Sequence, residues 1–470
     1  DPIPPLIYVD KLAEKYKGTA CGQFELNPVA GEFDDPAHQK QDILRIPLTA
    51  DGNVIVYGSA GSGKAMFIEA VCYSLMREHT PKEVNIYIMD LGAETFTAFA
   101  ESPFVGDVVL SYETEKVNNL FKLMMGKLGT RKKLLSHFGG SLTQYNRNAD
   151  SPEPSIVVVI NNFAAFNELF EEKSAEVSYL TREGPKYGIY FILSCTGVNN
   201  VKFSMLQNFK LMYCLQMNNA DDYSAVVGKT EGLLPEKYIG RGIFHRDKDS
   251  LLEFQTARLT SEEPPYSAIR AFCKKLAEKY SEEVAANVPV LPERVTKEFL
   301  SAYVKQGDLT KVPIGIEKTT LEISYYNFSA SVANLVLAAN QEWLEFTNSL
   351  AVLVAESCGI NTMVLAPSGS SAAYTGSKKL HVYSDPESCL NAVKYIYSTI
   401  LQRNNEYKSK LEKGETPLKY EPLFVVIQSI SQLQTALERF IPSEDKKEAS
   451  DDTPFNRLKV AIWKCAKEYS

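Results

Sequence analysis

Gly58-Ser59-Ala60-Gly61-Ser62-Gly63-Lys64-Ala65 is the stretch that decides the fold, because it has the form of a phosphate-binding loop. It follows an apolar strand predicted at Val54–Tyr57 and opens an amphipathic helix predicted from Lys64 to His79. In that setting, backbone N–H groups of the turn and of the helix N-terminus cradle phosphate oxygens, and the lysine reaches the outer phosphates. All residues of the loop are therefore candidates for binding ATP.

The groups that would assemble a metal ion beside this loop are missing. Ala65 stands where such loops carry the Ser or Thr that helps to hold Mg²⁺. The strand predicted at Ser155–Ile160 is followed by Asn161 and Asn162, where a working ATPase has acids that orient the metal shell and activate water. Loss of the general base alone costs roughly 10²–10⁴-fold in rate. We therefore expect weak Mg²⁺ binding and no catalytic residue at these positions.

The chain also repeats itself. Three predicted segments of the first half have counterparts in the second half, in the same order and at nearly constant separation, which indicates a duplicated module. The matched pairs are 53–73 with 334–353, Asn85–Asp90 with Asn361–Ala366, and Ser155–Ile160 with Pro422–Ile427. Within the second copy, the predicted strand is Leu335–Ala339 and the predicted helix is Trp343–Leu353.

Apolar strands without alternation, interleaved with long helices, are typical of a mostly parallel sheet covered by helices on both faces. The predicted fold class is α/β, with two tandem P-loop NTPase modules. We expect a first module at 1–260, a linker helix at 261–288 and a second module at 289–470. The first module adds strands at Gly188–Ser194 and Leu211–Met217 and a hairpin at Gly240–Arg258. The second module is predicted to be incomplete at its C-terminal end.

The second copy has lost the phosphate loop. Ala339–Glu345 replaces it, with Glu345 at the position of Lys64 and Trp343 where a glycine would leave space. A carboxylate at that place repels phosphate. We expect no nucleotide in the second module.

Composition narrows the class of protein. The 470 residues carry a net charge of −8, which argues against a broad nucleic-acid-binding surface. No apolar run approaches the ~18–20 residues that cross a bilayer. Eight cysteines are scattered singly and indicate reduced core thiols in the cytosol, and five isolated histidines offer no metal-binding spacing. Because Asp1 begins the chain instead of Met, we expect a fragment of a longer protein.

With these motifs, the chain resembles the C-terminal region of the type VII secretion ATPases, EssC in Firmicutes and EccC in mycobacteria, of the FtsK/SpoIIIE group. The resemblance covers nearly the whole chain. The segments that carry it are Asp34–Gln39, Gly58–Ala65, Ile156–Phe163, Gly188–Ser194, Val227-Gly228, Leu233–Pro235 and the opening Pro289–Pro292 of the second copy.

The resemblance implies that the two modules are RecA-like and are the second and third ATPase modules of a motor at the cytoplasmic face of the cell membrane. The membrane would be reached through an N-terminal region outside this chain. The implied partners are WXG100-like substrates, recognised through a C-terminal signal, and neighbouring modules of the same protein and of ring subunits. Met212 and Gln216 stand where the family usually has arginines, so no arginine finger is expected.

Three functions remain open from the sequence. The first is a secretion motor and scaffold that binds nucleotide in its first module and hydrolyses it weakly or not at all. The alternative is an active ATPase that uses atypical ligands or residues borrowed from a neighbouring subunit. A DNA translocase is the third, disfavoured by the acidic charge balance and by the lack of a basic DNA-reading module.

Overall fold

The computed structural model describes residues 2–16, 22–138, 141–247, 250–261, 265–318, 320–331, 333–337, 342–367, 377–416, 419–440, 453, 456, 457, 459 and 460. The chain divides into two compact units, which we call unit 1 (Asp1–Val290) and unit 2 (Leu291–Ser470). In the part of the chain that is described, no helix is both long and apolar enough to cross a membrane.

Unit 1 is built on one ten-stranded sheet with the order β2-β1-β10-β9-β8-β3-β7-β6-β4-β5. The strands are β1 (Val29–Asp35), β2 (Lys40–Arg45), β3 (Asn53–Tyr57), β4 (Val84–Asp90), β5 (Val105–Leu110), β6 (Ser155–Asn161), β7 (Ile189–Cys195), β8 (Phe209–Leu215), β9 (Arg241–Asp247) and β10 (Ser250–Thr256). The six strands from β8 to β5 are parallel, whereas β9, β10, β1 and β2 continue the sheet with antiparallel pairs. The predicted parallel sheet and the predicted hairpin are both confirmed.

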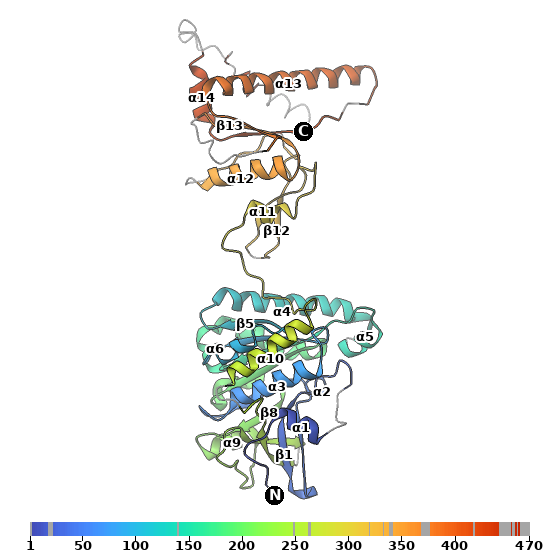
Figure 1. Ribbon diagram of the computed structural model, residues 1–470, viewed down its shortest axis with the longest axis vertical. Coiled ribbons are helices and arrows are strands. Elements are labelled where there is room, and N and C mark those ends of the chain that lie inside the picture. The colour runs from blue at the N-terminus through green and yellow to red at the C-terminus, as the bar shows by residue number, and fades with distance from the viewer. Residues whose placement is uncertain are drawn as a thin grey trace. The chain divides into compact units, whose positions relative to one another are not determined.

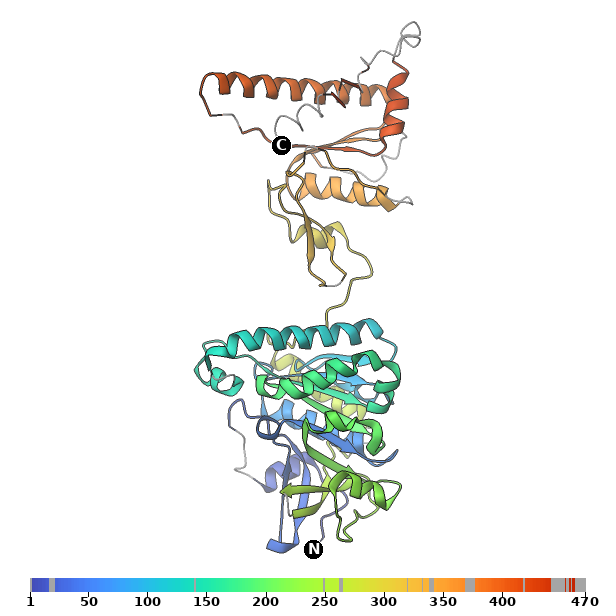
Figure 2. The same cartoon turned by 180° about the vertical axis from the view of Figure 1, so that it is seen from behind.

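Helices cover both faces of this sheet, so its central strands are apolar on both sides. On β3, Val54 and Val56 join the core beneath α3 and α10, while Ile55 and Tyr57 join the core beneath α4, α6 and α7. Figure 1 shows α3 and α10 side by side, and Figure 2 shows the opposite face. The helices are α1 (Val9–Lys15), α2 (Leu48–Asp51), α3 (Lys64–Glu78), α4 (Thr114–Leu134), α5 (Leu142–Asn148), α6 (Phe163–Leu169), α7 (Ser174–Glu183), α8 (Phe203–Leu206), α9 (Ala220–Val227) and α10 (Tyr266–Lys279).

The segment predicted as a linker belongs to unit 1. Ile269, Cys273 and Leu276 of α10 are buried in the core over α3, because the apolar stripe of this helix faces the sheet. After α10 the chain crosses unit 1 as an irregular segment, residues 283–289, which we call the strap. The boundary between the units therefore falls after the strap, at Val290.

Unit 2 repeats the edge of the unit 1 sheet. Its three parallel strands have the order β14-β13-β15, which matches β5-β4-β6. The elements are α11 (Lys297–Ser301), β11 (Val312–Ile316), β12 (Ile323–Tyr326), α12 (Glu342–Glu356), β13 (Asn361–Leu365), β14 (Leu380–Tyr383), α13 (Pro386–Glu412), β15 (Leu423–Ile427) and α14 (Ile430–Glu438). β11 and β12 form a separate antiparallel pair.

The strand predicted at Leu335–Ala339 is wrong for its described part. Leu335, Val336 and Leu337 have no regular structure and are exposed, and Ala338 and Ala339 lie outside the described residues. In unit 1 the matching strand, β3, is held between β7 and β8. Among the described residues of unit 2 no strand occupies either place, so an apolar run there has no hydrogen-bonded neighbour.

Candidate nucleotide site

The loop Gly58–Ala65 lies at the carboxyl ends of three neighbouring strands, β3, β7 and β8, and is hydrogen-bonded to two of them. It leaves β3 and enters α3 at Lys64. Gly58 N donates to Cys195 O at the end of β7 (3.0 Å), and Ser59 N donates to Gln216 O just after β8 (2.7 Å). The structure thus gathers all of the predicted loop residues into one strand–loop–helix turn.

Two glycines are required by the shape of this loop. Gly61 and Gly63 have φ of 75° and 103°, a region that favours glycine. A Cβ on Gly63 would also lie 2.7 Å from Gly240 N, so a side chain there would push away the segment before β9.

The loop presents free hydrogen-bond donors. Within the described residues, the backbone N–H groups of Ala60, Gly61, Gly63, Lys64 and Ala65 have no protein acceptor. Together with the positive end of the α3 dipole, they form a cradle for an anion.

Lys64 supplies the positive charge but is folded back on the loop. Its Nζ donates to Gly58 O (2.7 Å) and Ser59 O (2.8 Å). Burial lowers the pKa of this lysine from its ordinary value, because the charged form is poorly solvated there. An anion between the free N–H groups and Nζ would restore that lost solvation.

Three positions that supply metal or water ligands in P-loop ATPases carry other residues here. The Ala65 methyl group packs against the core beneath α3 and α10 and offers no oxygen. Asn161 and Asn162 lie at the end of β6, which β7 separates from β3. Asn162, at φ 67°, caps α6 by accepting from Ala165 N (3.3 Å) and donates to Leu91 O (3.3 Å). Its amide is thus used to start a helix.

Asn161 is part of a hydrogen-bonded chain that runs across three strand ends. Its Nδ2 donates to Asp90 Oδ1 (2.9 Å) at the end of β4, and its Oδ1 accepts from Ser194 Oγ (2.8 Å) at the end of β7. Ser194 Oγ in turn accepts from Asn162 N (2.8 Å). The two asparagines are therefore structural in this arrangement, where an ATPase has free carboxylates.

Asp90 was not predicted from the sequence as part of this site. This carboxylate is fully buried and also accepts from Phe96 N (3.1 Å). The one available signal was its place at the end of an apolar strand. An aspartate at position 161 would face it directly, which explains why an amide fits here.

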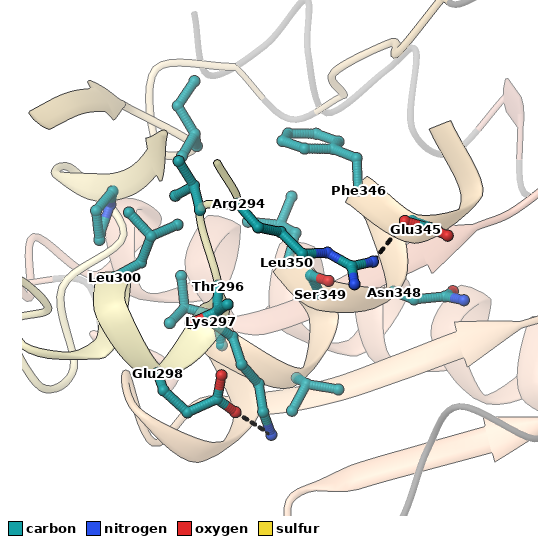
Figure 3. A pocket seen from close by; sticks show the side chains of 15 residues that line it. Arg294, Thr296, Lys297, Glu298, Leu300, Glu345, Phe346, Asn348, Ser349 and Leu350 are labelled. Atoms are coloured by element: carbon teal, nitrogen blue, oxygen red, sulfur yellow. Dashed lines mark ion pairs between the residues drawn. The ribbon is translucent and has the colours of Figure 1, made fainter. Parts of the chain in front are cut away.

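The corresponding place in unit 2 is different. Figure 3 shows Glu345 on α12 at the rim of a 790 Å³ cavity, in an ion pair with Arg294 at 3.5 Å. Both side chains are largely exposed. Lys297 and Glu298, also on the cavity wall, form another ion pair at 3.8 Å. The rim of this cavity is thus occupied by charges of both signs.

Comparison with known proteins agrees with these features. Residues 32–233 match the sequence model of the FtsK/SpoIIIE family. The ESX secretion system protein YukB of Bacillus subtilis is 24% identical over 421 residues, and the type VII secretion system protein EssC of Staphylococcus aureus is 23% identical over 365 residues. These matches cover 86% and 74% of this chain but 28% and 24% of the relatives, so the chain spans about a quarter of their length.

Two solved structures share the fold of both units. EssC (ATPases 2 and 3) from Geobacillus thermodenitrificans matches with a TM-score of 0.76 and 17% identity, over 93% of this chain and 90% of that one. Thermomonospora curvata EccC (ATPases 2 and 3), in complex with a signal sequence peptide, matches with a TM-score of 0.60 and 19% identity, over 98% and 91%. The predicted resemblance to type VII secretion ATPases of the FtsK/SpoIIIE group, and to their second and third modules, is confirmed.

Proposed function

We propose that this chain is a motor and scaffold portion of a type VII secretion ATPase, in which unit 1 binds the phosphates of ATP without efficient hydrolysis and unit 2 recognises the exported substrate. One observation carries the first half of this proposal. The free N–H groups and Lys64 form a phosphate cradle, whereas Ala65, Asn161 and Asn162 put no hydroxyl or carboxylate at the positions that hold Mg²⁺ and activate water in P-loop ATPases.

This division of groups separates binding from turnover. In P-loop ATPases a bound Mg²⁺ neutralises the charge that develops on the transferred phosphoryl group. Here the loop can hold and orient phosphates, whereas Ala65, Asn161 and Asn162 offer neither the usual metal ligands nor a group that takes a proton from water. Unit 2 would bind no nucleotide, because Glu345 replaces the lysine.

Calorimetry with ATP, with and without Mg²⁺, tests this. We expect binding that depends little on Mg²⁺, and no phosphate release above background. Robust turnover abolished by Lys64→Ala would favour the alternative, an active ATPase with atypical or borrowed ligands. In that case, restoring Ala65→Thr, Asn161→Asp and Asn162→Glu together would add little.

The second half of the proposal starts from the strap of unit 1. Ala285 N donates to Pro103 O (2.8 Å), and Ala286 O accepts from the Tyr87 hydroxyl (2.7 Å). Val288 is buried in the core beneath α4, α6 and α7. Unit 1 therefore holds a short peptide segment beside β4, β5 and α4 by backbone hydrogen bonds and one aliphatic anchor.

The matching surface of unit 2 differs in the residues that the structure describes. Counted from their capping residues, Asn119 of α4 corresponds to Asn391 of α13. Asn119 is buried and donates to Pro289 O of the strap (2.9 Å), whereas Asn391 is exposed. One helical turn beyond Asn391 on α13, Tyr395 lines a 290 Å³ cavity whose other walls come from β13, β14 and the start of β15.

We place the substrate signal in this cavity, which we call the strap-like groove. The C-terminal signal of a WXG100-like protein would occupy it, with an aliphatic side chain where unit 1 has Val288. The Thermomonospora curvata EccC structure, which is a complex with a signal sequence peptide, supports a peptide ligand for such modules. The larger cavity of Figure 3 is less suitable, because its rim is lined by ion pairs.

Fluorescence anisotropy with a labelled C-terminal peptide of a WXG100-like protein tests the groove. Asn391→Ala combined with Tyr395→Ala should weaken binding about tenfold, the effect of losing ~1.4 kcal/mol. Tyr326→Ala is the matched control, because this tyrosine is 42% exposed but lies on β12 outside the groove. Equal affinity of the double variant and the control would reject this location.

The remaining partners follow from the same family. We propose that the chain works at the cytoplasmic face of the cell membrane, in contact with neighbouring modules and ring subunits, and without binding nucleic acid. Its net charge of −8 supports the last point. Salt-sensitive binding of duplex DNA would contradict the expected absence of nucleic-acid binding and would support the DNA translocase hypothesis.

A further inference from the structure

The segment just before β9, residues 236–240, forms a fixed wall beside the phosphate loop. Gly240 N donates to Ser62 O of the loop (2.9 Å). Gln216 Nε2, at the end of β8, donates to Glu236 O and Tyr238 O (both 3.0 Å), and Gln255 Nε2 donates to Ile239 O (2.9 Å). Because the carbonyl groups of Glu236, Tyr238 and Ile239 are bonded inward, the backbone of the segment is held against the loop.

Two large apolar side chains of this wall are nevertheless exposed. Tyr238 is 45% exposed and Ile239 is 56% exposed. The Tyr238 ring lies on the buried guanidinium of Arg241 (5.4 Å), which fixes its orientation. Ile239 lies against the first turn of α3, since a Cβ on Gly63 would be 3.2 Å from its Cγ2.

An exposed aromatic and aliphatic pair beside an anion cradle suits a ligand with a phosphate end and a flat ring. Stacking on an aromatic side chain holds any base, because every base has a π-face. The carbonyl groups of Glu236, Tyr238 and Ile239 already accept hydrogen bonds from protein donors, so ring stacking is the main contact that we expect from this segment.

We propose that Tyr238 and Ile239 form the base-binding wall of the unit 1 nucleotide site and hold a purine ring by stacking, without selection between adenine and guanine. This inference rests on the proposed phosphate binding by unit 1 and adds the site for the purine ring of the same ligand. Gln216 is then a positioning residue, which holds the wall in place where the family usually has an arginine.

The test compares three ligands on the full chain: ATP, GTP and inorganic tripolyphosphate. We expect ATP and GTP to bind within threefold of each other, and Tyr238→Ala to weaken both about tenfold. Tripolyphosphate should be unaffected by Tyr238→Ala, because it has no ring. Tyr238→Phe should keep the wild-type affinities, and Lys64→Ala should weaken all three ligands.

Tyr112→Ala is the matched control, since Tyr112 is 72% exposed but follows β5 at the far edge of the sheet. If Tyr238→Ala binds ATP with unchanged affinity and the chain still binds tripolyphosphate, Tyr238 does not contact the base. That result would reject the base-binding wall but not the proposed phosphate binding. A tenfold difference between the affinities for ATP and GTP would contradict the proposal that the wall does not select between adenine and guanine. If wild-type chain binds neither ATP nor tripolyphosphate, both proposals fall.

Discussion

Units 1 and 2 share three strands and a long helix but differ in what surrounds them. β6 is paired on both sides and every one of its residues except Asn161 is buried, whereas β15, with β13 as its neighbour in the described sheet, is buried only at Val426. The helices α4 and α13 bury corresponding residues: Val117, Leu120, Phe121 and Met124 match Cys389, Ala392, Val393 and Ile396.

The difference between the units shows which features the fold needs. Strand order and the buried helix stripe are the same in both, so the apolar pattern is enough to maintain them. The phosphate loop and the strap are found in unit 1, and Glu345 and an open groove take their places in unit 2. Site chemistry has therefore changed while the strand arrangement has stayed.

The largest effect is expected at a pair of matched arginines. Arg131 of α4 is 1% exposed and donates to Tyr187 O (2.9 Å), Gly188 O and Pro154 O. Arg131→Ala removes these three hydrogen bonds of a buried side chain and should destabilise unit 1 by about 3–5 kcal/mol. Arg403, its counterpart in α13, is only partly buried, and Arg403→Ala should cost about 1 kcal/mol or less.

Hydrogen exchange of β6 and β15 measures the two units separately. Similar losses in both variants would mean that α4 and α13 do not have the matched roles described above.

The next effect concerns the two residues at the lysine position. Lys64→Ala should weaken ATP binding to the chain by roughly 10–100-fold, because a charge-assisted hydrogen bond is lost. Glu345→Ala should leave ATP affinity unchanged. A gain of a second ATP site in Glu345→Lys would show that unit 2 lacks only the charge, contrary to our account.

A third comparison uses the ends of β6 and β15. Asn161→Asp would place two carboxylates at the 2.9 Å contact with Asp90, and should destabilise unit 1 by about 1–2 kcal/mol. One of the two acids would keep its proton with a raised pKa, so the loss should be smaller at pH 5 than at pH 8. Gln428→Glu, the matched change, faces Asn348 and should cost less. Thermal unfolding at both pH values checks this, and equal losses at the two pH values would contradict it.

The smallest effect is a pH dependence confined to unit 1. Burial lowers the pKa of His79, so the unfolded chain takes up its proton more readily than the folded unit. Stability is therefore fully present above the ordinary histidine pKa of about 6.5 and is lost as the pH falls below it, by at most about 1 kcal/mol. His79→Gln should flatten this loss. His381→Gln, at an exposed position of unit 2, should leave it unchanged.

Local patterns predicted most of unit 1. The loop between Tyr57 and Lys64 and the apolar strands gave the parallel sheet, because both signals are short-range. The antiparallel strands β1 and β2 were not predicted, since they join the sheet through the pairing of β1 with β10, which lies far along the chain. The loop residues and both asparagines could be identified from sequence, but not the bond from Asn161 to Asp90, because adjacency of β4 and β6 is a property of the sheet. The strand prediction at Leu335–Leu337 was wrong for the same reason, because a strand forms only beside a hydrogen-bonded neighbouring strand.

The contact of Lys64 with its own loop makes ligand capture an exchange reaction. Before Nζ can meet a phosphate, it must leave Gly58 O and Ser59 O. Bonds to two neutral carbonyl groups are exchanged for charge-assisted bonds to phosphate, so the release of Nζ subtracts from the heat and from the affinity of capture. Calorimetry therefore reports the difference between the two sets of bonds, and displacement of a fluorescent anion measures occupancy independently.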